Sequence, residues 1–226
     1  MIDGALKCGV KKFIFLGSSC IYPKYSPQPI KEDYLLSDSL EPTNQWYAIA
    51  KISGIKSCEA IKKQFKKDYI SLMPTNLYGY NDNFDLKTSH VIPAMIRKFH
   101  EAKLNNDKSV VLWGTGKPMR EFLFAEDLAD AVIFSMENEL AENMYNIGTG
   151  NDISIRDLAI IIKKIIGFQG DIIWDNSKPD GTPKKLMDIS KMESLGWKYS
   201  TNIEEGIKKT YDWFLDNIEK IKEIKL

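Results

Sequence analysis

The sequence is poor in the features that mark several common protein classes. Its 226 residues include three cysteines, Cys8, Cys20 and Cys58, and no C-x-x-C pair, which argues against a disulfide framework or a structural zinc site. No apolar run approaches the roughly 20 residues that a membrane-spanning helix needs, and the opening stretch MIDGALKCG lacks the apolar core of a signal peptide. We therefore expect a cytoplasmic protein with no bound metal and no membrane partner.

An excess of one charge sign is also absent. The 31 lysines and arginines balance 31 aspartates and glutamates, so no overall field favours nucleic acid, and we expect none as a partner. Arginine itself is scarce, since the chain holds only Arg97, Arg120 and Arg156. Because the planar guanidinium can bind a phosphate through two parallel hydrogen bonds, each of the three is a candidate anion-binding residue.

A glycine-rich phosphate-binding turn is the third absence. Neither G-x-G-x-x-G nor G-x-x-G-x-x-G occurs in the chain. Such a turn, placed between a strand and a helix, is how a parallel α/β protein holds the pyrophosphate of a dinucleotide. The two GTG triplets at 114–116 and 148–150 are isolated turns, so the pattern alone indicates no pyrophosphate site.

What the sequence does contain is an alternation of predicted strands and helices. Apolar runs predict strands over 11–16, 69–74, 109–114, 144–148 and 171–175, the first two of them buried. Helical spacing predicts helices over 47–65, 91–103, 125–136, 154–165 and 201–217. Ser154 is the expected N-cap of the fourth, and Thr201 with Glu204 forms the expected capping box of the fifth. The alternation predicts an α/β fold with a largely parallel sheet.

Reactive side chains follow the first predicted strand. The stretch LGSSCIYPK places Ser18, Ser19 and Cys20 where the sheet meets solvent, and α/β proteins bind ligands outside the carboxyl ends of their strands. In an extended segment Ser18 and Cys20 would point to the same side. Further along, Tyr47 and Lys51 share one face of a predicted helix, and a nearby ammonium favours the phenolate. Such a pair can exchange a proton with a carbonyl oxygen, although a packed tyrosine beside a solvated lysine has the same spacing.

A serine at a strand end followed by Y-x-x-x-K resembles the short-chain dehydrogenase/reductases. Longer stretches resemble successive motifs of one branch of that superfamily, the GDP-L-fucose synthases. They are LGSSCIYPK, EPTNQWYAIAKISGIKSCE, SLMPTNLYGYNDNFDLKTSHVIPAMIRKFHEAK, LWGTGKPMREFLFAEDLADA, YNIGTGNDISIRDLA and KPDGTPKKLMDISKMESLGW. They occur in order and run from near the first residue to the last predicted helix.

The resemblance implies an incomplete Rossmann-type parallel sheet and two domains. Residues 1–77 and about 114–150 would form a partial NADP-binding domain, and about 78–113 and 151–226 a smaller α/β domain that binds the GDP-sugar. Family members begin with a strand, a glycine-rich turn and further βα units that are absent before KKFIFL. We therefore expect a truncated reading frame or a missing part supplied by another chain, and a family-type homodimer that is weakened.

The resemblance also implies roles for individual residues. Ser18, Tyr47 and Lys51 match the catalytic triad of the reduction, and Cys20 and His90 match the acid/base pair of the epimerisation. The NADP(H) site would be lined by Leu16, Gly17, Ser18, Ser19, Lys51, Pro74, Thr75, Asn76, Leu77 and His90. The GDP-sugar would be held by Lys98, Trp113, Arg120, Lys178 and Asp180. The second histidine, His100, is expected to be a solvated helix residue.

The implied activity is the NADPH-dependent 3,5-epimerisation and 4-reduction of GDP-4-keto-6-deoxy-D-mannose to GDP-L-fucose. Two alternatives stay open: an inactive fragment that retains GDP-sugar binding, and another nucleotide-sugar epimerase of the same superfamily, which would not need Cys20 together with His90. Single residues also have ordinary interpretations. Cys20 and Trp113 could be core residues, and Arg120 could be a surface ion-pair partner.

Overall fold

The computed structural model describes residues 1–223 and divides the chain into two compact units. Unit 1 contains Met1–Asn76, Glu121–Asp152 and Lys185–Ser200; unit 2 contains Leu77–Arg120, Ile153–Lys184 and the chain from Thr201 onward. Both units combine helices with parallel strand pairs, so the predicted α/β class is confirmed. No helix within residues 1–223 is both long and apolar enough to cross a membrane.

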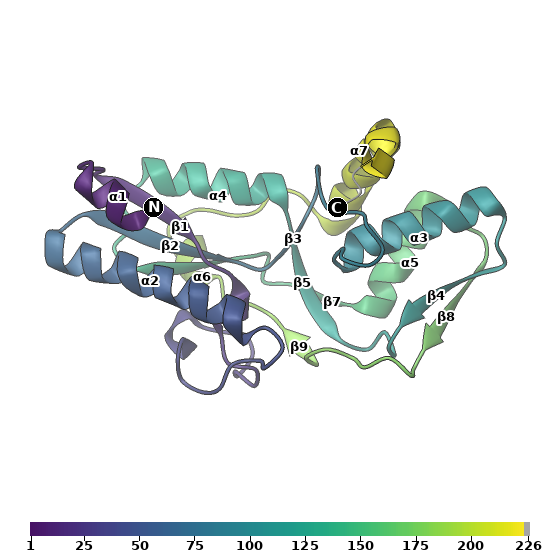
Figure 1. Cartoon of the computed structure of the whole chain (residues 1–226), viewed down its shortest axis with the longest axis horizontal. Helices are drawn as coiled ribbons and strands as arrows, with labels where there is room; N and C mark the ends of the chain where they lie inside the picture. Colours follow the sequence, from purple (N-terminus) through teal and green to yellow (C-terminus); the bar gives the residue numbers. More distant parts are fainter. Residues whose placement is uncertain (224–226) are drawn as a thin grey trace. The chain divides into compact units, whose positions relative to one another are not determined.

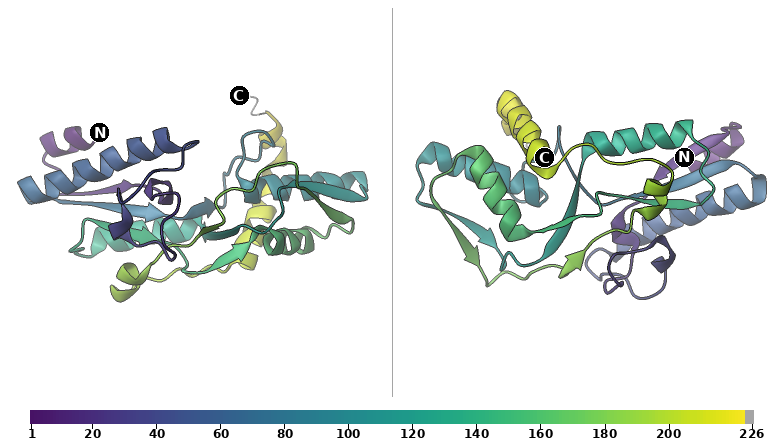
Figure 2. Two further views of the ribbon diagram at one scale, coloured as in Figure 1. Left: turned by 90° about the horizontal axis from the view of Figure 1, so that it is seen from below. Right: turned by 180° about the vertical axis from the view of Figure 1, so that it is seen from behind.

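Unit 1 is built on a three-stranded parallel sheet. Its strands β1 (Lys12–Leu16), β2 (Asp68–Pro74) and β6 (Met144–Ile147) lie in the order β1-β2-β6. Helices α1 (Ile2–Lys7) and α2 (Gln45–Phe65) cover one face of this sheet, and α4 (Ala125–Glu137) covers the other (Figures 1 and 2). Because all three strands are parallel, their carboxyl ends meet at one edge, where the chain continues into Gly17, Thr75 and Gly148.

Strand β1 differs from the buried strand that the sequence predicts. It lies at the edge of the three-stranded order, so its side chains are only half-buried and Leu16 is 39% exposed. Strand β2, in the middle, is buried from Tyr69 to Pro74. Helix α2 turns Ala48, Ile52 and Ile55 toward the core, whereas Ile49 is exposed.

Unit 2 contains a second parallel pair with helices packed on it. Strands β4 (Ser109–Trp113) and β8 (Asp171–Asp175) pair in register, with Ser109 opposite Asp171. Helix α3 (Val91–Asn105) packs against β4 and α5 (Ile155–Ile166), and α5 also packs against α7 (Ile203–Glu223) (Figure 2). The predicted helices and strands of this unit are therefore present.

The helix ends of unit 2 confirm one predicted cap and correct another. The Ser154 hydroxyl accepts a hydrogen bond from the Asp157 amide at 3.0 Å, as expected at the start of α5. Helix α7 begins at Ile203, and the side chain of Asn202 accepts the Glu205 amide at 3.0 Å. The cap is therefore Asn202 and not Thr201, because the helix starts one residue later than the capping-box spacing requires.

The expectation for His100 is wrong. This histidine is only 6% exposed, and its Nδ1 lies 3.0 Å from the Tyr211 hydroxyl, with the Phe214 ring edge-on to it. Helix α3 turns this side chain inward, where α7 covers it. His100 is thus part of the core of unit 2.

Four short strands carry the chain across the boundary of the two units. They are β3 (Asn76–Tyr78), β5 (Met119–Phe124), β7 (Asp152–Ser154) and β9 (Lys184–Lys185), and they form one sheet in which β5 pairs with β9. None of these four strands was predicted from the sequence, because their runs are short or mixed in polarity. Short helices complete the fold at η1 (Ser19–Ile21), η2 (Glu32–Tyr34) and α6 (Ser190–Ser194).

The division of the chain differs in two places from the predicted domains. Residues 114–120 belong to unit 2, and residues 185–200 belong to unit 1. The second segment returns to unit 1 because it buries Met187 and Ile189 in a cluster with Ile21 and Ile30. Two backbone hydrogen bonds also join this segment to Ile30. The Ile30 amide donates to the Leu186 carbonyl, and the Asp188 amide donates to the Ile30 carbonyl.

A buried polar cluster fixes the long loop at 23–45. The side chain of Asn146 accepts the Tyr22 hydroxyl at 2.6 Å and donates to the carbonyls of Ile30 and Asp188. The backbone amide of Asn146 donates to the buried carboxylate of Glu32 at 2.9 Å. The loop that follows η1 is thereby held against the end of β6.

Candidate active site

The candidate site of unit 1 begins where β1 ends. The Gly17 amide still bonds to the Leu72 carbonyl at 2.8 Å, after which Ser18 is extended and caps η1. Gly17 is required here, because a side chain would collide with the sulfur of Met73. The Ser18 hydroxyl accepts the Cys20 amide at 3.2 Å. Ser18 and Cys20 therefore lie side by side through a turn of 3₁₀ helix, and not through the strand alternation that we expected.

Helix α2 brings Tyr47 and Lys51 to the same end of β1. The Lys51 ammonium donates to the Leu16 carbonyl at 2.8 Å and lies 5.6 Å from the centre of the Tyr47 ring. Tyr47 is 48% exposed, so a ligand can reach its hydroxyl. Both residues lie in the first two turns of α2, where the preceding loop delivers the helix to this edge. The structure thus gathers Ser18, Tyr47 and Lys51 around the carboxyl end of β1.

Cys20 is a half-buried thiol beside a cation. The Lys185 ammonium lies 3.5 Å from its Sγ. Burial raises the pKa of Cys20, but the charge of Lys185 and hydrogen bonds from Ser18, Lys185 and Asn44 outweigh it, so the pKa is lower than that of an ordinary thiol. A larger share of this cysteine is therefore thiolate at neutral pH, which is the form that can act as a base.

The segment after β2 faces the same edge, but much of its polar capacity is already used. The side chains of Thr75 and Asn76 both donate to the Glu121 carbonyl, at 3.3 and 2.8 Å, and Thr75 is buried. Pro74 ends β2, whereas Leu77 belongs to unit 2. The predicted role of Pro74–Leu77 in the cofactor site remains a prediction.

The donor groups at this edge suit one end of a nicotinamide dinucleotide. A ribose needs hydroxyl or ammonium partners, and Lys51 supplies the ammonium next to the exposed Tyr47 hydroxyl. Ser18 follows the adjacent strand end, the usual ligand-binding position of an α/β sheet, whereas Ser19, one residue on, is buried. These residues fit the nicotinamide ribose. Residues 1–223 contain no glycine-rich turn for the pyrophosphate, so the fit concerns that end alone.

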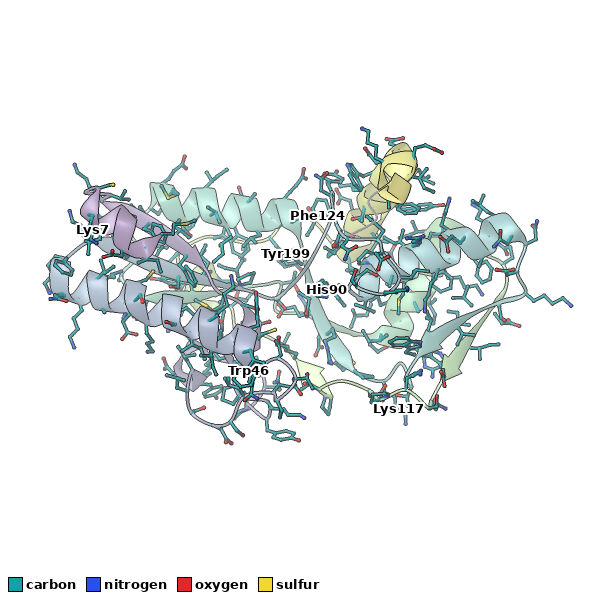
Figure 3. The ribbon with its side chains drawn as sticks, viewed as in Figure 1. Lys7, Trp46, His90, Lys117, Phe124 and Tyr199 are labelled. Carbon is teal, nitrogen blue, oxygen red and sulfur yellow. The ribbon has the colours of Figure 1, made fainter. Side chains whose placement is uncertain are left out.

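His90 lies in unit 2, at the N-cap of α3, with its side chain exposed (Figure 3). Nearby, burial raises the pKa of Asp82, an effect that the Asn83 amide and the charge of His90 oppose. An exposed imidazole near a carboxylate is suited to proton transfer. The role of His90 as the acid of an epimerisation remains a prediction.

Three of the predicted GDP-sugar residues form one cluster in unit 2. The Trp113 ring is 68% exposed, and two ammonium groups approach it, from Lys98 at 5.8 Å and Lys178 at 5.7 Å. Burial lowers the pKa of Lys98, whose ammonium also donates to the Val111 carbonyl. Trp113 is therefore not a core residue, and an exposed ring with two cations suits a planar base and an anion.

The other two predicted residues lie beside a glycine turn. Asp180 accepts the amide and the hydroxyl of Thr115, and its charge acts on Arg120, whose pKa burial lowers. Gly114 is required for this approach, because it has a positive φ and a side chain there would collide with Asp180. Arg120 thus lies next to the 114–116 turn as a half-buried cation.

The three arginines now differ in what they can bind. Arg97 is engaged with Glu101 at 2.7 Å, and Arg156 donates to the Thr115 carbonyl and covers the ring of Trp174. Arg120 donates one hydrogen bond to the Met119 carbonyl, which leaves most of its five donors for other partners. Among the arginines it is the best placed for a diphosphate.

Two residues that the sequence analysis overlooked, Lys185 and Asn44, contact Cys20. Lys185 lies in the stretch KPDGTPKK, from which we selected Lys178 and Asp180 as site residues but not Lys185. A lysine 165 residues from its partner gives no local signal. The sequence likewise gives no local signal for the three hydrogen bonds that Glu121 accepts from backbone amides, because their donors lie far along the chain.

Comparison with known proteins places this geometry in context. A family model described as "NAD dependent epimerase/dehydratase family" matches residues 1–148. The "Probable GDP-L-fucose synthase 1" of Oryza sativa subsp. japonica is 56% identical over 224 residues, which are 99% of this chain and 68% of the rice protein. The GDP-L-fucose synthase of Escherichia coli (strain K12) is 49% identical over 233 residues, covering 98% of this chain and 72% of that protein.

A solved structure with a similar fold is the "gdp-l-fucose synthetase from Naegleria fowleri bound to NADP". It has a TM-score of 0.87 and 33% identity to this chain, and the match covers 96% of this chain and 71% of that one. The likeness therefore extends over both units in sequence and in fold.

Proposed function

Because the chain belongs to the NAD-dependent epimerase/dehydratase family, we propose that it catalyses the 3,5-epimerisation and NADPH-dependent 4-reduction of GDP-4-keto-6-deoxy-D-mannose to GDP-L-fucose. The names and high identity of its relatives support this substrate. The cluster of Trp113, Lys98 and Lys178 supports a site for the base and charge of a GDP-sugar.

The observation that carries the proposal is the Cys20 thiol at the edge that also holds Ser18, Tyr47 and Lys51. A ketone reduction needs only groups that bind and protonate the carbonyl oxygen. A half-buried thiol held next to an ammonium is an additional base, and epimerisation is the step that requires one. This favours a combined epimerase and reductase over a simple reductase.

Epimerisation begins with proton removal from the carbon next to the ketone. The Cys20 thiolate takes the C–H proton and becomes a thiol, while the electron pair of that bond moves onto the carbonyl oxygen. The Ser18 and Tyr47 hydroxyls donate hydrogen bonds to this oxygen and stabilise its developing charge. We assign the proton that is returned on the opposite face of the sugar to His90, on the basis of the family resemblance.

The 4-reduction uses the same carbonyl. A nicotinamide dinucleotide, when bound, supplies a hydride to C4. Tyr47 gives its hydroxyl proton to the oxygen, and the Lys51 ammonium beside the ring stabilises the resulting phenolate. Lys51 would also hold the ribose of the cofactor, and the segment from Leu16 to Ser19 would line its nicotinamide end.

The proposal separates into two measurable reactions. Incubated in D₂O with GDP-4-keto-6-deoxy-D-mannose, the chain should introduce deuterium at C3 and C5 of the sugar, as mass spectrometry detects. With NADPH present, it should oxidise NADPH in proportion to GDP-L-fucose formed. The Cys20→Ser variant should lose deuterium incorporation more than reduction. A folded chain that binds the GDP-sugar in calorimetry but performs neither reaction would contradict the proposal.

We also propose a cytoplasmic location and a homodimer, with neither nucleic acid nor membrane as a partner. The scarcity of cysteine supports the cytoplasmic location, and the balanced charge supports the absence of a nucleic-acid partner. Exposed apolar side chains on α2, among them Ile49 and Trp46 (the latter labelled in Figure 3), support a subunit contact. Light scattering of the purified chain would test the dimer. A monomer at micromolar concentration would contradict it.

A further inference from the structure

Within the proposed function, on which this inference rests, we propose that Lys185 is the positioning residue of the Cys20 thiolate and that Glu121 fixes the segment carrying it. The ammonium holds the sulfur as an anion and sets its direction. The buried carboxylate of Glu121 secures Lys185 at this distance. None of these three residues is near another in the sequence, so only the folded unit 1 creates the arrangement.

The contact between Lys185 and Cys20 is direct. Nζ lies 3.5 Å from Sγ, within reach of a charge-assisted hydrogen bond to a thiolate. The other groups that act on the sulfur, the Ser18 hydroxyl and the Asn44 amide, are neutral. Within residues 1–223, Lys185 is therefore the charged group that favours the ionised sulfur. Both residues are half-buried, so solvent screens their attraction less than at the surface.

The segment that carries Lys185 is held from two sides. Directly after it, the Leu186 amide donates to the Gln28 side chain at 2.8 Å, and the Leu186 carbonyl accepts the Ile30 amide at 2.7 Å. The loop that contains Gln28 and Ile30 follows Cys20 in the chain. The same loop therefore connects the sulfur to the strand that presents the ammonium.

Glu121 provides the second attachment. Its Oε2 accepts the Met187 amide at 2.9 Å, while its Oε1 accepts the amides of Thr149 and Gly150 at 2.6 and 2.8 Å. Glu121 and Met187 are both fully buried, so the Met187 amide has no water to replace the carboxylate. A loss of Oε2 as an acceptor would release Met187, and with it Lys185 two residues earlier.

The geometry explains why a carboxylate is needed at position 121. A glutamine has one acceptor oxygen and one NH₂ group. If the oxygen keeps Thr149 and Gly150, the NH₂ group faces the Met187 amide, and two donors then oppose each other. Glu121→Gln should therefore loosen the 185–187 segment and retain the 149–150 turn.

Cysteine-resolved alkylation tests the proposal without substrate or cofactor. The full chain is treated with iodoacetamide between pH 5 and 10, and mass spectrometry gives the rate at each cysteine, with the exposed Cys8 as an internal reference. In Lys185→Met the alkylation midpoint of Cys20 should rise by about one pH unit. That shift corresponds to about tenfold less thiolate at neutral pH. Lys185→Arg should retain most of the wild-type midpoint.

Two further variants distinguish positioning from a general structural role. Lys184→Met removes the neighbouring exposed ammonium and should leave the Cys20 midpoint unchanged. Glu121→Gln should raise the midpoint, by less than Lys185→Met, with the rate at Cys8 unaffected. In D₂O, deuterium incorporation by Lys185→Met should fall about tenfold near pH 7 and recover as the pH is raised.

The outcomes separate this inference from the proposed function. If Lys185→Met is folded by circular dichroism and keeps the wild-type Cys20 midpoint, the inference is overturned, whatever the activity. An equal shift in Lys184→Met and Lys185→Met would overturn it as well. A wild-type chain that shows the shifts but incorporates no deuterium would refute the proposed function and leave the role of Lys185 supported.

Discussion

Asn146 offers the sharpest test of how unit 1 holds its longest loop. Its side chain, fully buried at the end of β6, joins Tyr22 to the carbonyls of Ile30 and Asp188. Asn146→Ala removes all three hydrogen bonds at once and adds no new group. We expect it to destabilise unit 1 and to release the 23–45 loop.

The magnitude follows from the groups left without a partner. The Ile30 carbonyl keeps the Asp188 amide as a donor at 2.8 Å, so it remains satisfied. The Tyr22 hydroxyl and the Asp188 carbonyl lose their partner, and each such loss costs about 1–3 kcal/mol when the group is buried. The free energy of unfolding should therefore fall by about 4 kcal/mol. With a urea dependence of about 2 kcal/mol per molar, the midpoint should fall by about 2 M.

Urea unfolding followed by circular dichroism measures this change, and limited proteolysis reports on the loop. Asn105→Ala is the matched control, because it removes the same atoms from an exposed position at the end of α3 and should change stability by less than about 0.5 kcal/mol. The loop should become sensitive to protease in Asn146→Ala and not in the control. An Asn146→Ala midpoint within error of the control would refute the reasoning.

A charged substitution at the same position adds a pH test. Asn146→Asp places a carboxylate against two carbonyl oxygens and close to Glu32, which raises its folded pKa above the unfolded value. A carboxyl with a raised folded pKa stabilises the protein at low pH and loses that contribution as the pH rises through the folded pKa. Asn146→Asp should thus be less stable than Asn146→Ala at pH 7 and should recover toward pH 5. Equal stability of the two variants at both pH values would contradict this.

Three further predictions concern the site and its surroundings. Lys51→Met should reduce the rate of NADPH oxidation by at least about 100-fold and change the urea midpoint little; near-wild-type turnover would exclude Lys51 from the chemistry. Gly148→Ala should cost about 1–3 kcal/mol in urea unfolding, because its new methyl group collides with the Glu121 carboxylate, and an unchanged midpoint would show that the carboxylate can move. Cys58 should resist alkylation at pH 8, since burial raises its pKa to about 11, and mass spectrometry would reveal any early labelling.

Much of the fold could be predicted because its signals are local. The helix at 155–166 has a capping serine, an apolar stripe and a closing glycine within 14 residues, and all three signals are present in the local sequence. The short strands β5 and β9 were not, because MREFLF alternates poorly and KK carries no apolar residue at all. Such strands exist because their partners are already in place, which is a property of the fold and not of the segment.

The site residues, too, could be predicted only where the signal is local. Ser18, Tyr47 and Lys51 could be selected from motifs, and α2 and β1 do bring them to one edge. Burial was harder to judge, since His100 and Trp113 have reversed environments: the histidine is in a core and the tryptophan is exposed. Polarity alone does not decide exposure when a partner across the chain satisfies the polar atom.

The division of unit 1 into three separate segments has a consequence for how the chain folds during synthesis. Segment 185–200 supplies the last contacts of Ile30 and Glu121, yet more than 150 residues leave the ribosome between Ile30 and Met187. Until segment 185–200 has been synthesised, the loop after β1 and the Glu121 carboxylate of the nascent chain lack the hydrogen-bond partners that this segment supplies. Native pairing over such a separation is slow, so emerging chains should depend on chaperones for longer than a protein whose domains are each encoded continuously.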